Sequence, residues 1–315
     1  MHKDAVVYVA GSTGLVGSAL VRELRSQGYK NLVLKRIDLT NSNETYDFFE
    51  EEKPEYVFVA AAKVGGIHAN NTYPSDFIEV NLKISSNVIS AARQFGATKL
   101  LYLGSSCIYP RDADQPIREE SLLAGPLEPT NAPYAIAKIA GISLCQSSNR
   151  QHKTNFIAAM PTNLYGPGDN FDLQSSHVLP ALMRKIHEAK TEHKPEVEVW
   201  GSGDPIREFL HVDDCAKALV TMMQEFEPKD LCYLNVGCGY GISISELATL
   251  LKEAVGYTGK LKFNPAMPDG TPKKVLNIDR LCGLGWSPTI SLSEGLAKTY
   301  EWFRRSKWTN LSNLR

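Results

Sequence analysis

Three glycines directly follow the first apolar run of the chain, and their position constrains the fold more than any other feature. The run covers residues 6–10, and Gly11, Gly14 and Gly17 follow it at intervals of three, before a stretch with helical periodicity. Glycine has no Cβ, so it permits a tight turn and close approach of an anion, while the next helix offers free N–H groups. A strand, glycine turn and helix in this order predict a dinucleotide pyrophosphate site. The spacing is GxxGxxG, whereas ordinary dinucleotide dehydrogenases carry GxGxxG.

Short β-rich runs alternate with helix-compatible stretches through the first half of the chain. The runs lie at 6–10, 32–34, 56–61, 100–104 and 156–160, and the helical stretches at 16–27, 45–52, 76–94 and 135–149. Continuous apolar strands separated by helices indicate a parallel sheet that is covered on both faces. We therefore expect an α/β fold with a Rossmann-type doubly wound parallel sheet over residues 1–166.

The second half follows a different pattern after the turn-rich residues 166–168. Helices are expected at 179–189, 212–225, 244–255 and 292–304, with a strand at 197–201, a short run at 233–236 and a loop at 264–271. We expect residues 167–315 to form mostly a smaller C-terminal α+β substrate lobe. Segments near 205–240 are expected to return to the first domain.

Composition narrows the class of protein. The 315 residues carry a formal net charge of -1, which favours neither nucleic acid nor an anionic membrane as a partner. No apolar run reaches the ~18 residues that a membrane span needs, and the N-terminus has no secretory pattern. The six cysteines are scattered without a CxxC pair, which favours reduced thiols and a cytoplasmic location over disulfides or a metal site.

The end of the second apolar run bears on the choice of cofactor. NAD sites usually place a carboxylate there for the ribose 2′-hydroxyl, but this run ends in Lys35 and Arg36. An arginine can hold a 2′-phosphate through charge-assisted hydrogen bonds, so we predict NADP(H). Asp38 could contact a ribose or an adenine instead, and the two basic residues could be solvated surface charges.

A tyrosine and a lysine four residues apart indicate hydride chemistry. Tyr134 and Lys138 share one face of a predicted helix, and a nearby ammonium stabilises a phenolate and lowers its pKa. A tyrosine helped in this way can donate a proton to a carbonyl near neutral pH. Ser105 follows the apolar run at 100–104, where open parallel sheets bind ligands, and can bond the same carbonyl oxygen. A strand-end serine can also simply cap a helix.

The order of glycine loop, strand-end serine and YxxxK resembles the extended short-chain dehydrogenase/reductase family. That resemblance implies a Rossmann domain with a small C-terminal lobe that binds nucleotide sugars.

Two further residues point beyond hydride transfer. Cys107 stands two residues after Ser105, and a cysteine near a lysine and a helix N-terminus can become a partial thiolate. Such a thiol can remove a proton from carbon beside a ketone, although a buried structural thiol is the commoner role of cysteine. His177 follows the junction at 166–168, and a histidine is the natural proton donor near neutral pH.

Longer strings across the chain resemble the GDP-L-fucose synthase family. They cover residues 60–67, 69–74, 104–110, 133–138, 160–167, 200–203, 207–213 and 268–272. The resemblance implies epimerisation of GDP-4-keto-6-deoxy-D-mannose at C3 and C5, then reduction at C4 by NADPH. Cys107 would be the base and His177 the acid. Ser105 and Tyr134 would polarise the C4 ketone, while Lys138 tunes Tyr134.

The same resemblance implies ligand contacts and a homodimer formed through helices packed across a two-fold axis. Substrate contacts fall on Lys185, Trp200, Arg207 and Asp269, with Lys274 in a neighbouring basic loop. Trp200 could instead belong to the core, and Lys185 stands where family members often carry arginine. Cofactor contacts fall on Gly11, Ser12, Thr13, Gly14, Leu15, Val16, Gly17, Arg36, Asp38, Ala61, Tyr134, Lys138, Pro161, Asn163, Leu164 and His177.

Three other interpretations fit the same scaffold less well. A nucleotide-sugar 4,6-dehydratase would carry an Asp-Glu pair after the strand-end serine, where this chain has Cys107 and Ile108. A C4 epimerase would keep NAD tightly bound and need no cysteine–histidine couple. A non-catalytic dinucleotide sensor tends to lose the tyrosine or the lysine, and this chain keeps both.

Overall fold

A six-stranded parallel sheet forms the centre of the computed structural model, which describes residues 1–267, 269–306 and 308. Pro268, in the 268–272 string, lies outside the described residues. The strand order is β10-β5-β4-β3-β1-β2, and every neighbouring pair runs parallel. The bounds are β1 (Val7–Ala10), β2 (Leu32–Val33), β3 (Tyr56–Val59), β4 (Lys99–Leu103), β5 (Phe156–Pro161) and β10 (Tyr233–Val236).

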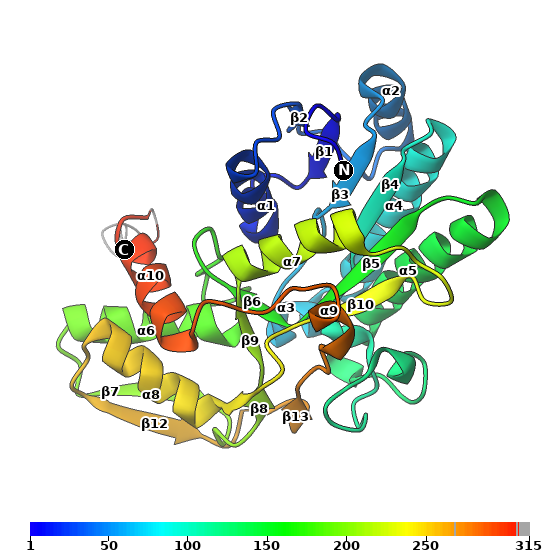
Figure 1. Cartoon of the computed structure of the whole chain (residues 1–315). Helices are drawn as coiled ribbons and strands as arrows, with labels where there is room; N and C mark the ends of the chain where they lie inside the picture. Colours follow the sequence, from blue (N-terminus) through cyan, green and yellow to red (C-terminus); the bar gives the residue numbers. More distant parts are fainter. Residues whose placement is uncertain (268, 307, 309–315) are drawn as a thin grey trace.

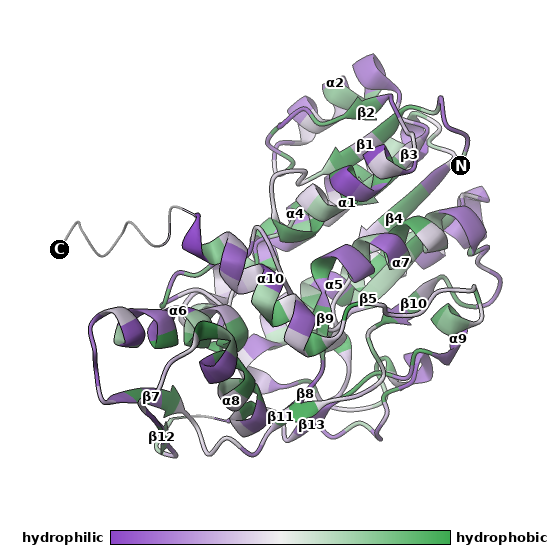
Figure 2. Cartoon of the chain, turned by 60° about the vertical axis from the view of Figure 1, so that its left-hand side comes forward, coloured by the Kyte–Doolittle hydropathy of each residue, from purple (hydrophilic) through white to green (hydrophobic). Residues whose placement is uncertain are grey.

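Helices cover both faces of this sheet (Figure 1). One face packs on α1 (Leu15–Ser26) and α7 (Val212–Glu225), and the other on α2 (Ser42–Glu52), α4 (Pro74–Gln94) and α5 (Ala132–His152). Side chains of a strand alternate between faces, so Val7 and Val9 enter the first core while Tyr8 and Ala10 enter the second. The strands are among the most hydrophobic segments of the chain (Figure 2). The predicted Rossmann-type doubly wound fold is thereby confirmed.

The C-terminal lobe has its own core beneath three helices. These are α6 (Val178–Thr191), α8 (Ile244–Val255) and α10 (Leu292–Arg304). Three small sheets complete the lobe and its junction with the main sheet. They pair β7 (Glu196–Trp200) with β12 (Lys260–Asn264), β8 (Ile206–Arg207) with β11 (Ile242–Ser243) and β13 (Lys273–Lys274), and β6 (Asn163–Tyr165) with β9 (Phe209–His211).

The bounds of some helices were predicted correctly, whereas the starts of others were predicted too late in the sequence. Helices α7, α8 and α10 have the predicted bounds, but α2 begins at Ser42 rather than at residue 45. The reason is Asn41, whose side chain accepts a hydrogen bond from the Glu44 N–H and caps the helix. Helix α4 likewise begins at Pro74 instead of residue 76. The short helices α3 (Ile67–Thr72) and α9 (Asp279–Cys282) were not predicted.

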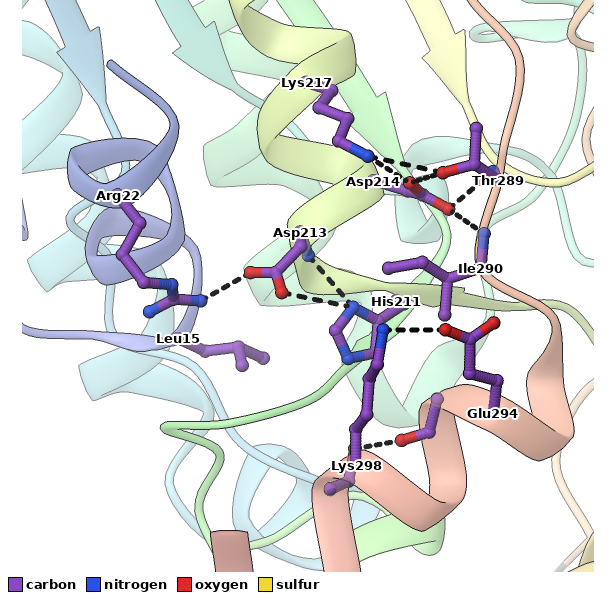
Figure 3. A network of polar contacts seen from close by, with 12 residues as sticks. Leu15, Arg22, His211, Asp213, Asp214, Lys217, Thr289, Ile290, Glu294 and Lys298 are labelled. Atoms are coloured by element: carbon purple, nitrogen blue, oxygen red, sulfur yellow. Dashed lines mark hydrogen bonds and ion pairs between the residues drawn. The ribbon is translucent and has the colours of Figure 1, made fainter. Parts of the chain in front are cut away.

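A polar network ties α1, α7 and α10 together where the two halves of the chain meet (Figure 3). Buried Asp214 accepts hydrogen bonds of 2.7 Å from the N–H and hydroxyl of Thr289 and from the N–H of Ile290. Arg22 of α1 pairs with the neighbouring Asp213. The loop that leads into α10 is therefore held against the start of α7, which in turn packs on α1. Within the described part of the chain, no helix is both long and apolar enough to cross a membrane.

Candidate active site

The glycine loop after β1 forms a close-fitting cradle at the start of α1. Gly11 has a φ of +79°, and a Cβ there would lie 2.8 Å from the backbone nitrogen of Ala61. A Cβ on Gly17 would lie 2.0 Å from the Gly11 carbonyl oxygen, so neither position tolerates a side chain. In the described chain α1 has no side-chain cap and no acidic residue in its first turn. Its first N–H groups, on Leu15, Val16 and Gly17, can therefore bind an anion. These residues fit a dinucleotide pyrophosphate.

Three charged residues near the end of β2 have different surroundings. The Lys35 ammonium pairs with Glu51 at 3.0 Å. The Asp38 carboxylate accepts hydrogen bonds from the N–H and hydroxyl of Thr40 at 2.9 and 2.7 Å, which lower its pKa. Arg36 is exposed, and no side chain among the described residues pairs with it. Arg36 is thus the cation that is free to meet a phosphate here.

Tyr134, Lys138 and Ser105 come together at the carboxyl end of β4. Tyr134 lies in the first turn of α5 and its hydroxyl hydrogen-bonds the side chain of Ser105. Lys138, one turn later, is buried and donates to the Leu103 carbonyl oxygen at 2.7 Å, with its ammonium 5.8 Å from the centre of the Tyr134 ring. The geometry thus gives the tyrosine a hydroxyl partner and a nearby cation.

Burial of Tyr134 and Lys138 favours the neutral form of each group, and for Tyr134 this shifts the pKa opposite to the predicted direction. It raises the pKa of Tyr134 well above its usual range, and it lowers the pKa of Lys138 to about 7. The sequence had predicted a lowered tyrosine pKa. That prediction omitted desolvation, which disfavours the charged form of each group and outweighs the hydrogen bond from Ser105. Any lowering of the tyrosine pKa must therefore depend on the protonated form of Lys138.

Cys107 lies in a single turn of 3-10 helix after Ser105 and is partly exposed. Its N–H donates to the Ser105 hydroxyl oxygen at 3.2 Å. Two groups of the site interact electrostatically with this thiol, namely Tyr134 and the guanidinium of Arg207. Burial lowers the pKa of Arg207, while Cys107, Asp269 and Glu128 oppose that change. An arginine therefore stands near Cys107.

His177 stands immediately before α6 and is accessible to solvent. The protein around it nevertheless displaces enough water to lower its pKa, so the neutral ring is favoured. The loop after β3 contacts the two residues that precede this histidine in the sequence. Gly66 donates its N–H to the Ser175 carbonyl oxygen at 2.9 Å, and a Cβ on Gly66 would lie 2.4 Å from the Ser176 carbonyl oxygen. Gly66 lies in the string at 60–67, but no feature of the sequence marked it as a site residue.

The predicted substrate contacts lie together in the C-terminal lobe. Trp200 is 46% exposed and is therefore not a core residue, and the Lys185 ammonium lies 4.5 Å from the centre of its ring. Arg207 donates to the Asp269 carbonyl oxygen at 3.2 Å. The Asp269 carboxylate in turn accepts from the Ser202 N–H at 2.8 Å. Lys274, on β13, lies opposite Arg207 in register.

The remaining predicted cofactor contacts lie at the same edge of the main sheet. Ala61 follows β3 and touches the glycine loop, and Pro161 ends β5. Asn163 and Leu164 belong to β6, and the Asn163 side chain donates to the Glu208 carbonyl oxygen at 2.9 Å. Ser12 and Thr13 lie within the glycine loop, and the Ser12 hydroxyl reaches the Leu34 carbonyl oxygen at 3.5 Å.

Two polar residues just before Tyr134 were not predicted. The Oδ1 atom of Asn131 and the Oε2 atom of Glu128 are buried and accept no hydrogen bond from the described residues, although Glu128 Oε2 forms an ion pair with Arg111 at 3.5 Å. Glu128 also interacts electrostatically with Arg207. A buried acceptor such as Asn131 Oδ1 can be satisfied by a hydroxyl group of a ligand. No pattern in the sequence distinguishes these two from ordinary loop residues.

The chain is similar to known enzymes along nearly its whole length. Residues 7–237 match the NAD dependent epimerase/dehydratase family. GDP-L-fucose synthase 1 of Arabidopsis thaliana is 56% identical over 307 residues, covering 96% of this chain and 94% of its own. GDP-L-fucose synthase of Escherichia coli K12 is 53% identical, covering 94% and 96%. A crystal structure of a GDP-L-fucose synthetase from Naegleria fowleri bound to NADP superposes with a TM-score of 0.88 at 29% identity, covering 97% and 95%.

Proposed function

This chain belongs to the NAD-dependent epimerase/dehydratase family, and within it we propose that the chain epimerises GDP-4-keto-6-deoxy-D-mannose at C3 and C5 and reduces the product at C4 to GDP-L-fucose. The observation that carries the proposal is the meeting of Ser105, Cys107 and Tyr134 at the end of β4. A proton donor for a ketone and a base for the carbons beside it then share one site.

Epimerisation needs a base and an acid on opposite faces of the sugar. Both C3 and C5 lie beside the C4 ketone, so loss of either proton gives an enolate whose charge falls on the C4 oxygen. Cys107 would take the proton, and Ser105 and Tyr134 would stabilise the oxygen through hydrogen bonds. His177 would deliver a proton to the other face, which inverts the carbon. The same residues can serve both carbons in turn.

Reduction follows at the same ketone. When bound, NADPH supplies the hydride to C4 of the sugar. Tyr134 would give its hydroxyl proton to the C4 oxygen, with Ser105 holding that oxygen in place. The protonated form of Lys138 would stabilise the phenolate that Tyr134 becomes. The ketone therefore keeps its partners through both stages.

Preference for NADPH over NADH rests on Arg36. The 2′-phosphate carries negative charge, and Arg36 is the exposed cation beside β2 without a partner among the described residues. Its neighbour Lys35 pairs with Glu51, and Asp38 pairs with Thr40. An NADP-bound structural relative supports this choice.

The decisive experiment follows NADPH oxidation and solvent deuterium uptake in one reaction with GDP-4-keto-6-deoxy-D-mannose. The wild-type protein should consume NADPH and place deuterium at C3 and C5. The Cys107→Ser variant should lose uptake by about 100-fold or more, since removal of a general base costs about 10²–10⁴-fold. NADPH consumption without uptake in the wild type would refute the epimerase stage. No consumption would refute the proposed function.

We also propose a homodimer formed through α4 and α5. These helices pack side by side, and the outer face of α5 carries Ile136, Ala140, Ser143 and Ser147 without a charge, with Ile136 47% exposed. Light scattering on a sizing column tests the proposal. The Ser143→Arg variant should run as a monomer, whereas Thr249→Arg on exposed α8 should keep the wild-type mass. A monomeric wild-type protein would refute it.

Finally, we propose that the protein works in the cytoplasm. All six cysteines are free thiols, which suits a reducing compartment. Fractionation of cells that express the chain, with a cytosolic marker protein as reference, tests this location.

A further inference from the structure

An exposed tryptophan on β7 lies beside a carboxylate that is not among the predicted substrate or cofactor contacts. Glu198 precedes Trp200 by two residues on the same exposed face of the strand. Its Oε2 atom accepts a hydrogen bond from the Trp200 indole at 3.3 Å, and its Oε1 atom accepts one from the Asn264 amide at 2.8 Å. We propose that Glu198 reads the base of the nucleotide sugar, and that it selects guanine while Trp200 packs against the ring. This inference rests on the proposed function.

The position of Trp200 suits the base end of a nucleoside diphosphate. A Cβ on the next residue, Gly201, would lie 2.2 Å from the Asp269 carboxylate, and the Asp269 carbonyl oxygen accepts from Arg207. The tryptophan is therefore linked through Gly201 and Asp269 to the arginine that suits a diphosphate. Figure 1 shows β7 and β12 at the edge of the C-terminal lobe, away from the main sheet. A base at β7 would thus leave the sugar pointing toward Arg207 and Cys107.

Trp200 itself offers a surface on which a base can stack. Nearly half of its surface is open, and a base can stack on an exposed aromatic side chain. Stacking does not distinguish one base from another, because every base has a π-face. The Lys185 ammonium over the same ring attracts the phosphates of any nucleotide. Selectivity must therefore come from a group at the edge of the ring, and Glu198 is the carboxylate placed there.

The chemistry of a carboxylate favours guanine over the other bases. Guanine presents two parallel donors, N1–H and the N2 amino group, which match the two oxygens of a carboxylate. Adenine presents an acceptor at N1, and uracil presents one donor between two carbonyl oxygens, so both match poorly. An ionised carboxylate has about four acceptor sites, and Glu198 uses two of them in the structure. It can accept from a base without losing Trp200 or Asn264.

Inosine diphosphate provides a sharp probe, because it differs from GDP by the loss of the N2 amino group. Calorimetric titration of the wild-type protein should give a dissociation constant for GDP about tenfold or more below that for IDP, since a hydrogen bond to a charged group is lost. The Glu198→Gln variant should bring the two constants within about threefold. Thermal unfolding curves of each variant establish that the fold is intact.

Glu196→Gln is the matched control. Glu196 lies two residues earlier on the same exposed face, and its partner is Lys262 at 3.4 Å, so the variant removes the same charge without touching Trp200. It should keep the wild-type ratio of the GDP and IDP constants. An equal change in both variants, or an unchanged ratio in Glu198→Gln, would overturn the inference.

The titration also separates this inference from the proposed function. A wild-type protein that binds ADP or UDP more tightly than GDP would refute both. A wild-type protein that selects GDP over ADP and UDP but not over IDP would refute only the proposal that Glu198 selects guanine. The proposed reaction would then stand on its own evidence.

Discussion

The backbone N–H of Gly66 donates to the carbonyl oxygen of Ser175 at 2.9 Å, so the loop after β3 is fastened two residues before His177. Gly66 has a φ of -68°, which alanine also adopts, but an added Cβ would lie 2.4 Å from the Ser176 carbonyl oxygen. The Gly66→Ala variant must therefore move the chain in front of His177. We expect deuterium uptake to fall about 10–100-fold, because a displacement of about 1 Å in an active site has effects of this size.

Binding of NADPH provides the contrast for this variant. Among the described residues the glycine loop at 11–17 makes no backbone hydrogen bond to residues 175–176, and His177 is one of many predicted cofactor contacts, so the dissociation constant for NADPH should change less than threefold. Gly283→Ala, with a φ of -60° and a nearest neighbour at 3.2 Å, is a control remote from the site and should keep full uptake. Normal uptake in Gly66→Ala would mean that this contact does not position His177.

Replacing Arg36 should change the choice of cofactor. The Arg36→Gln variant should raise the KM for NADPH about 10–100-fold, because a charge-assisted bond to the 2′-phosphate is lost, and leave the KM for NADH nearly unchanged. Steady-state rates with each cofactor measure this. Lys35→Gln removes an equal charge from a residue that pairs with Glu51 at 3.0 Å, and should alter neither constant by more than about threefold. Equal effects of both variants would assign the preference to general charge.

Regular elements could be predicted from the sequence, whereas contacts between distant segments could not. The ends of α7, α8 and α10 follow from apolar periodicity and from caps such as Ser291 before α10. Ser105, Tyr134 and Lys138 were also predictable, because strand ends of a parallel sheet meet at one edge. The contact of Gly66 with Ser175 joins segments more than 100 residues apart and leaves no local pattern. The same holds for Glu198, whose role depends on its neighbour Asn264 from β12.

The short strands and the pKa directions could not be predicted from the sequence for a related reason. Strands of two or three residues, such as β8, cannot display a period of two. The raised pKa of Tyr134 follows from the water that the folded chain removes from around it, and this desolvation is a property of the whole fold. The sequence showed the cation near the tyrosine, but not the desolvation of both groups.

The rate of reduction should depend on the charge of Lys138. Burial lowers the pKa of Lys138 to about 7, so in the cofactor-free protein the ammonium is lost as the pH rises through 7. Since the charged form stabilises the Tyr134 phenolate, kcat/KM should fall on the alkaline side of about pH 7. A pH profile from 5.5 to 9.5 measures this. The Lys138→Arg variant keeps its charge, so its lower activity should show no alkaline decline below pH 9. An unchanged decline would assign the titration to another group.

Asp214 should be the main electrostatic support of the junction between α7 and α10. The buried carboxylate accepts three hydrogen bonds of 2.7 Å from Thr289 and Ile290. Burial raises its pKa, but these hydrogen bonds and the nearby Lys217 ammonium outweigh burial and lower it. In Asp214→Asn the amide turns an N–H group toward donors, so unfolding in urea at pH 7 should show a loss of about 2–4 kcal/mol. Asp213→Asn, next along the helix and exposed beside Arg22, should lose at most about 1 kcal/mol.

The pH dependence of the same variant follows from the direction of the shift. A carboxyl group whose pKa is lowered on folding adds stability above its unfolded pKa of about 3.9, and this stability disappears as the pH falls through the folded value. The difference between wild type and Asp214→Asn should therefore be full at pH 6–7 and shrink below about pH 4. Urea unfolding at several pH values between 3 and 7 measures it. A difference that stays constant down to pH 3 would mean that Asp214 acts through its shape and not through its charge.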